Sequence, residues 1–182
     1  MKHFCLVICI LFYAHNSFGK NSYFPQELSN LQFGMSCHSV STQRHMSSFE
    51  KEMNFRVSAI DSAPDSVEIA KITYYFGILE DQPLYSVSIQ YQPDVNVEQI
   101  AVDLFGVKGE EEMWILESAQ PYAIRAWVFT ENPVVENANN LVITAAVPST
   151  GEWYEHQKIE SEEVFSEMFE KGKNISVLCP KH

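Results

Sequence analysis

Glycine, basic side chains and long apolar runs are scarce in this chain of 182 residues. Its seven glycines allow few backbone sites of strained conformation. Twelve basic against 24 acidic side chains give a net charge of −12, which repels nucleic acid and anionic lipid surfaces. Beyond the first 19 residues, no apolar run is long enough to span a bilayer.

The motifs of common enzymes and metal proteins are also missing. There is no His-x-x-x-His or Cys-x-x-Cys pair, no acidic calcium loop, no Gly-x-Ser-x-Gly elbow and no glycine-rich phosphate loop. His38 and His45, seven residues apart, are interpreted as solvated. The acidic runs at 110–112 and 160–163 are interpreted as solvated surface rather than paired catalytic acids. We therefore expect no catalytic residue, no metal site and no cofactor.

What is present begins with an export signal. A short basic start precedes an apolar run at residues 4–14, and Ser17 and Gly19 place small residues at the −3 and −1 positions of a cleavage site. This is the organisation of a secretory signal peptide over residues 1–19. The mature chain is expected to be a single domain, residues 20–182, that is secreted or periplasmic.

Cysteine usage fits that expectation. Cys5 and Cys9 lie within the signal, whereas Cys37 and Cys179 remain near opposite ends of the mature chain. Two thiols in an exported protein most often pair, so a disulfide is predicted. The alternatives are two separate buried thiols, or Cys37 as a nucleophile beside His38. Adjacent helical residues point about 100° apart, which disfavours the nucleophile.

The first half of the mature chain predicts one helix and three strands. The helix runs from Cys37 to about Met46, begins at Ser36 as N-cap and has Phe49 and Met53 as a possible extension. Alternation of apolar and polar residues predicts strands at 55–59, 69–78 and 84–91. In the last of these, one face carries Tyr85, Val87, Ile89 and Tyr91. A strand with one apolar face is typical of an antiparallel sheet.

The second half repeats this order. A helix is predicted at 97–105, between an Asn96 cap and Gly106. Three strands follow, at 113–117, 123–130 and 141–147, and then a helix at 161–171 and a short edge strand at 175–179. The order predicts an α+β two-layer domain, with an antiparallel sheet, helices on one face and a doubled helix-plus-three-strands unit.

Two stretches resemble a family of small envelope proteins. Leu31-Gln32-Phe33-Gly34-Met35-Ser36 before a helix is similar to the opening of the SmpA/OmlA (BamE-type) outer-membrane lipoproteins. The second half resembles the same family, with a helix ending in Leu104-Phe105-Gly106 before Trp114. Two such units in tandem look like the fold of β-lactamase inhibitor protein, although the lipid-attachment cysteine of the lipoproteins is missing. The resemblance implies an envelope or extracellular setting and a scaffolding or inhibitory role.

These observations favour a protein that works by binding. Trp153 and Tyr154, in a loop after the last core strand, are the candidate contact residues, unless they fold back over the sheet edge. The predicted function is a non-enzymatic protein-binding module, of the envelope-assembly or inhibitor kind, with an unidentified protein partner. The alternatives are a small secreted hydrolase whose site is assembled from distant polar residues, and a carrier of a small apolar ligand.

Overall fold

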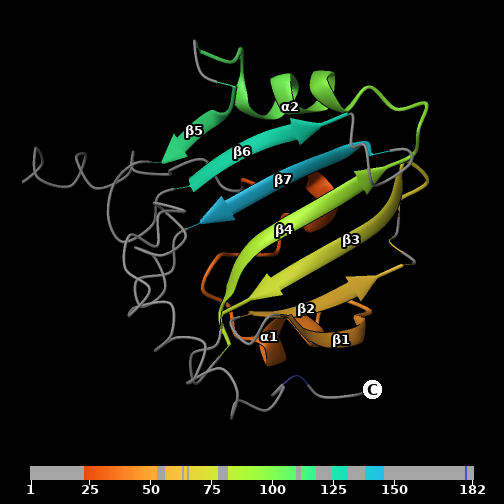
Figure 1. The fold of residues 1–182 in the computed structure, drawn as a ribbon, viewed down its shortest axis with the longest axis vertical. Helices are drawn as coiled ribbons and strands as arrows, with labels where there is room; N and C mark the ends of the chain where they lie inside the picture. Colours follow the sequence, from red (N-terminus) through yellow and green to blue (C-terminus); the bar gives the residue numbers. More distant parts are fainter. Residues whose placement is uncertain are drawn as a thin grey trace, which may run out of the picture.

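The computed structural model describes residues 23–52, 56–62, 64, 66–77, 82–109, 112–117, 124–130, 138–145 and 179. Over these residues the dominant feature is a seven-stranded antiparallel sheet (Figure 1). Its strands are β1 (Ser47–Glu52), β2 (Arg56–Asp61), β3 (Ile69–Phe76), β4 (Leu84–Tyr91), β5 (Trp114–Glu117), β6 (Ile124–Phe129) and β7 (Asn140–Ala145). The helices are the 3-10 turn η1 (Gln26–Leu28), α1 (Cys37–Ser41) and α2 (Val97–Phe105). This combination is the α+β class that the sequence predicts.

The strand order in space, β1-β2-β3-β4-β7-β6-β5, follows from two meanders. Strands β1 to β4 lie side by side in chain order, and α2 then leads to β5, from which β6 and β7 return to the centre (Figure 1). Strand β7 pairs with β4, with Ile143 opposite Val87 and Leu141 opposite Ile89. The last strands of the two meanders therefore meet in the middle of the sheet.

Helix α2 begins and ends where its local sequence predicts. The Asn96 side chain accepts a hydrogen bond of 3.1 Å from the backbone N–H of Gln99. Gly106 ends the helix with a φ of +86°, a conformation that side chains other than glycine rarely adopt. The buried residues Val97 and Ala101 turn one side of α2 toward the core.

Helix α1 is shorter than predicted, and a strand follows it. Ser36 caps it as expected, but the helix ends at Ser41 instead of continuing to Met46. The Thr42 hydroxyl donates to the carbonyl of Ser39 at 2.8 Å, a local bond that competes with helical continuation. Phe49, predicted as a possible helical extension, lies in β1, which pairs with β2.

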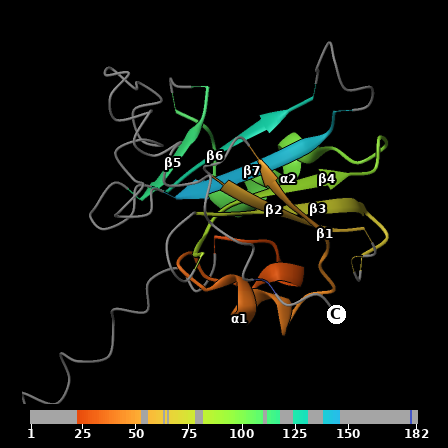
Figure 2. The ribbon, with the colours of Figure 1, turned by 60° about the horizontal axis from the view of Figure 1, so that its bottom comes forward.

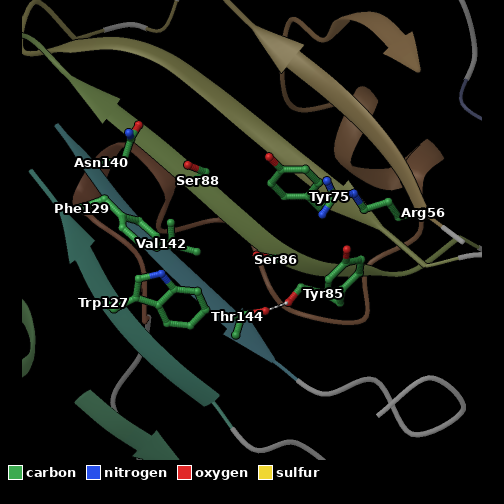
Figure 3. A pocket seen from close by; sticks show the side chains of 10 residues that line it. All are labelled: Arg56, Tyr75, Tyr85, Ser86, Ser88, Trp127, Phe129, Asn140, Val142 and Thr144. Atoms are coloured by element: carbon green, nitrogen blue, oxygen red, sulfur yellow. Dashed lines mark hydrogen bonds between the residues drawn. The ribbon is translucent and has the colours of Figure 1, made fainter. Parts of the chain in front are cut away.

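Strand β4 departs from simple alternation at one residue. Val87 and Ile89 are fully buried on the core face, as predicted. A register shift separates the pair Tyr75–Ser86 from the next pair toward the start of β4, so Tyr85 is an extra residue in a bulge. Tyr85 is 3% exposed, but its side chain lies on the opposite face, near Tyr75 (Figure 3). The prediction that Tyr85 shares a face with Val87 is wrong, because the bulge changes the alternation.

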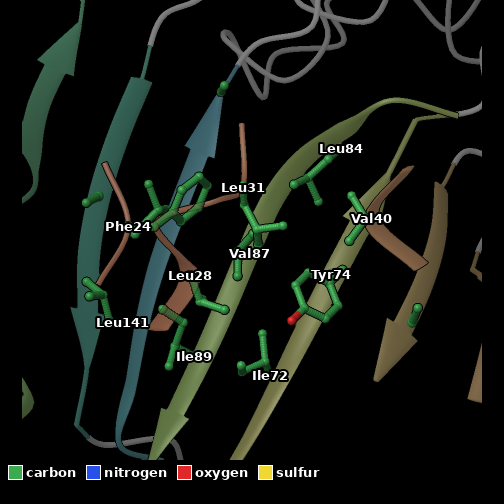
Figure 4. Close-up of a cluster of buried hydrophobic side chains, with 14 of the residues drawn as sticks. Phe24, Leu28, Leu31, Val40, Ile72, Tyr74, Leu84, Val87, Ile89 and Leu141 are labelled. Carbon is green, nitrogen blue, oxygen red and sulfur yellow. The ribbon is translucent and has the colours of Figure 1, made fainter. Parts of the chain in front are cut away.

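One apolar core joins the sheet to the segments before and between the meanders (Figure 4). The N-terminal segment with η1 and α1 lies against the sheet (Figure 2). Val40 of α1 and Ala101 of α2 belong to the same cluster of buried residues. The largest fully buried side chains of this cluster include Leu28, Leu31, Ile72, Tyr74, Phe76, Leu84, Ile89, Leu141 and Ile143.

A disulfide attaches the far end of the chain to this core. Cys37, the first residue of α1, is bonded to Cys179 with Cα atoms 5.3 Å apart, in agreement with the predicted pairing. Both cysteines are buried. The predicted signal at 1–19, the helix at 161–171 and the remainder of the 175–179 strand lie outside the described residues. Within the described part of the chain, no helix is long and apolar enough to cross a membrane.

Candidate binding site

The sheet face opposite the core carries a groove with a volume of about 330 Å³ (Figure 3). The groove crosses five strands, β2, β3, β4, β7 and β6, so it lies over the middle of the sheet. The ten residues that line it are Arg56, Tyr75, Tyr85, Ser86, Ser88, Trp127, Phe129, Asn140, Val142 and Thr144.

Small side chains from the two central strands form the floor of the groove. Ser86 lies opposite Thr144, and Ser88 lies opposite Val142, in the pairing of β4 with β7. The Thr144 hydroxyl donates to the carbonyl of Tyr85 at 3.3 Å (Figure 3), and the Ser86 hydroxyl donates to the carbonyl of Ile143 at 3.4 Å. The floor is therefore low because its residues are small, and its hydroxyl groups are oriented by the backbone of the sheet.

A pair of tyrosines forms one side of the groove. The rings of Tyr75 on β3 and Tyr85 on β4 have centroids 6.5 Å apart and are tilted by 42°. The guanidinium of Arg56, on β2, lies 4.7 Å from the centroid of the Tyr75 ring, within the range of a cation–π contact. The bulge at Tyr85 brings these two tyrosines to the same face.

Trp127 and Phe129 form the other side. Both belong to β6 and are two residues apart, so they point to the same face of the sheet. Their centroids are 6.2 Å apart and their ring planes cross at 88°, an edge-to-face arrangement. Phe129 is 46% exposed, which is unusual for a phenylalanine on a strand.

A second hollow, of about 580 Å³, is also lined by Trp127 and Phe129. Besides these two residues, its lining consists of Lys108, Glu112, Met113 and Val128. The groove differs from it in having serine, threonine and asparagine among its lining residues.

The side chains that line the groove are mainly aromatic or neutral and polar. The described residues that line it include no aspartate, glutamate or histidine. In the described ranges, no group of three or more His, Cys, Asp or Glu side chains is placed to hold a metal ion. The groove instead combines aromatic rings, one guanidinium and neutral hydrogen-bonding groups.

The assignment of Trp153 and Tyr154 as contact residues stays a prediction. Trp153 and Tyr154 lie outside the described residues. Trp127 and Phe129 were not predicted as site residues, although the strand at 123–130 was expected and their two-residue spacing places them together on one of its faces. The contribution of Tyr85 had no local signal, because it depends on the bulge.

Comparison of the chain with protein-family models, with curated proteins and with solved structures found no match.

Proposed function

We propose that this protein is an exported, non-enzymatic protein-binding module that contacts its partner through the grooved face of its sheet. The observation that carries the proposal is the set of residues in the groove. Two tyrosines, a tryptophan, a phenylalanine and an arginine line it, and no described lysine, aspartate or glutamate does. Tyrosine, tryptophan and arginine are the residues that dominate binding energy in protein interfaces, where lysine and acidic residues are depleted.

The rigidity of the groove supports the same conclusion. All ten residues belong to strands, and the floor lies on the two strands at the centre of the sheet. Contact side chains on a rigid scaffold lose little conformational freedom when a partner binds. The groove is also open to the surface, whereas a carrier of a small apolar ligand encloses most of its ligand.

The net charge of −12 supports a partner of opposite charge. An acidic protein attracts a basic one over distances of roughly a Debye length, about 8 Å at physiological ionic strength. We infer a basic protein partner whose encounter with this chain is accelerated by charge and whose contact is made by the aromatic pairs.

The proposal includes a finer description of the fold. Buried residues of α1, α2 and η1 all belong to one core cluster, which supports helices on one face of the sheet. Each meander follows a helix and ends in a central strand, which supports a doubled unit like the tandem arrangement of β-lactamase inhibitor protein, with strand β1 as an addition to the first unit. The predicted signal at 1–19 supports a secreted or periplasmic address. An envelope-assembly or inhibitor role, as in SmpA/OmlA-type and inhibitor proteins, follows from the resemblance.

Site-specific photo-crosslinking tests the proposed function. A photoreactive phenylalanine analogue replaces Ser88 on the groove floor, and in a control protein it replaces Val67, which is 93% exposed outside the groove. We expect a defined protein adduct in the secretome or envelope of the source from position 88 and not from position 67. Adding Trp127→Ala should remove the adduct. Equal adducts from both positions, or none from position 88, would contradict the proposal.

A further inference from the structure

The second hollow continues the candidate interface past the Trp127–Phe129 pair. Trp127 and Phe129 line both depressions, so a segment that occupies the groove and passes over these rings reaches the hollow next. Beyond the rings, the hollow is lined by Met113 and by Val128, whose side chain alternates with those of Trp127 and Phe129 and packs against the core. Methionine is flexible and polarizable, and it adapts its shape to apolar groups that contact it.

The charged groups at the hollow are of both signs. The ammonium of Lys108 lies 3.0 Å from the Glu98 carboxylate and 4.4 Å from the centroid of the Trp114 ring. The indole N–H of Trp114 donates to the carbonyl of Gly106 at 2.8 Å, which holds that ring in place. Glu112, at the same hollow, is exposed. A lysine whose charge is already compensated, together with one exposed carboxylate, gives the hollow no strong preference for a cation or an anion.

We propose that this hollow is an anchor site for an uncharged apolar side chain, of the leucine, methionine or aromatic kind, from the protein that binds the groove. The inference rests on the proposed function, because the occupant is part of the same partner. The volume of about 580 Å³ exceeds that of one side chain and falls within the roughly 300–1,000 Å³ of ligand pockets. Its lining includes tryptophan, phenylalanine and methionine, which are residue types enriched in protein interfaces.

The choice of an apolar occupant follows from what each alternative would meet. A partner's arginine or lysine would stack on Trp127, but Lys108 and Glu112 together would give its charge no net electrostatic gain. A partner's carboxylate would face Glu112 and would compete with Glu98 for Lys108. An apolar side chain meets neither difficulty, and it covers the exposed ring of Phe129.

Titration with small probes tests the chemistry of the hollow without the partner. The probes are N-acetyl-tryptophanamide, N-acetyl-leucinamide, N-acetyl-argininamide and N-acetyl-glutamic acid amide, each followed by NMR on the full mature chain labelled at methyl groups. We expect the tryptophan and leucine probes to shift the methyl signal of Met113 at concentrations at least threefold lower than the charged probes need. Lower concentrations for a charged probe, or no shift with any probe, would overturn the inference.

Two matched variants separate the hollow from general effects. Met113→Glu should weaken the binding of the two apolar probes at least fivefold. Val67→Glu places the same charge on an exposed apolar residue elsewhere and should leave that binding unchanged. Met113→Gln, which adds polarity without charge, should give an intermediate loss, and unchanged signals of buried methyls such as those of Ile89 verify folding. An equal loss of probe affinity in Met113→Glu and Val67→Glu would contradict the assignment of the hollow as the anchor site.

The crosslinking experiment distinguishes this inference from the proposed function. If the adduct from position 88 forms at full yield in the Met113→Glu variant, the partner uses the groove without the hollow, and only the inference fails. If the apolar probes bind as expected but no protein is captured from position 88, the proposed function fails, and with it the assignment of the occupant to a protein partner.

Discussion

Arg44 and Asp61 form an ion pair inside the protein, with 3.1 Å between the guanidinium Nη2 and the carboxylate Oδ2 and with side chains 9% and 2% exposed. The same guanidinium donates to the hydroxyl of Tyr74 at 3.1 Å and to the carbonyl of Glu27 at 3.2 Å. One side chain after α1 thus joins β2, β3 and η1. It contributes to the attachment of the N-terminal segment to the sheet.

Removing one member of this pair should therefore destabilise the fold strongly. Arg44→Met leaves the Asp61 carboxylate buried without its guanidinium, so we expect the free energy of unfolding to fall by about 3–5 kcal/mol. The double variant Arg44→Met, Asp61→Leu should recover part of that loss, because it leaves no buried charge. Urea unfolding of the three proteins measures this. A loss under about 1 kcal/mol for Arg44→Met would mean that the pair is accessible to water.

Two buried tyrosines should respond differently to loss of the hydroxyl. The hydroxyl of Tyr91 is buried and makes no hydrogen bond among the described residues, whereas that of Tyr74 accepts from Arg44. Tyr91→Phe should leave stability at pH 7 unchanged or higher, whereas Tyr74→Phe should cost about 1–3 kcal/mol. Thermal unfolding of both variants measures the two changes in stability. A larger loss for Tyr91→Phe than for Tyr74→Phe would contradict the hydrogen bonding described for the two hydroxyls.

The same tyrosines predict a loss of stability in alkali. Burial raises the pKa of Tyr91 and of Tyr74 above the ordinary value of 10.0. The folded state therefore keeps protons that the unfolded state releases, and stability that is fully present below about pH 10 is lost as the pH rises beyond it. The Tyr91→Phe variant should lose less stability than the wild type between pH 9 and about pH 11. If the free energy of unfolding falls equally with pH in the two proteins, Tyr91 does not contribute to the loss of stability in alkali.

Adjacent residues of β4 should differ sharply, because they point to opposite faces. Ile89 is fully buried and lies opposite Ile72 and Leu141, whereas Ser88 faces the groove. Ile89→Ala should cost about 2–5 kcal/mol. Ser88→Ala should change stability by less than about 0.5 kcal/mol. Denaturant midpoints of the two variants measure the difference, and similar values would refute the assignment of faces.

Association with the partner captured through the groove should slow as salt is added. The chain carries a net charge of −12, so screening weakens the attraction of a basic partner and lowers the association rate. Trp127→Ala should instead raise the dissociation rate and weaken binding by more than about 1 kcal/mol. Surface plasmon resonance at low and high salt separates the two effects. An association rate that rises with salt would point to an acidic partner.

The elements that the sequence predicts well are those whose signals are local. Helix α2 has its cap at Asn96, its apolar stripe and its terminating Gly106 within one short stretch, and the structure has the same bounds. The α+β class follows in the same way from alternation in the strands and from the stripe of α2. The cysteine pairing was predictable because only two cysteines lie beyond the predicted signal, and two cysteines allow one intramolecular bond.

Strand β1, the bulge at Tyr85 and the groove depend on contacts between segments that are distant in the sequence. Strand β1 has no clear alternation and forms because its backbone pairs with β2, so it was not predicted. The bulge that turns Tyr85 to the groove exists only in the register of β3 with β4. The groove combines residues from Arg56 to Thr144, and a sequence does not show which outward side chains of different strands become neighbours. The sequence by itself determined helix α2, the fold class and the charge of this protein, because these depend on neighbouring residues and composition. The tertiary structure alone decided the grooved face, because strand order and register place its residues together.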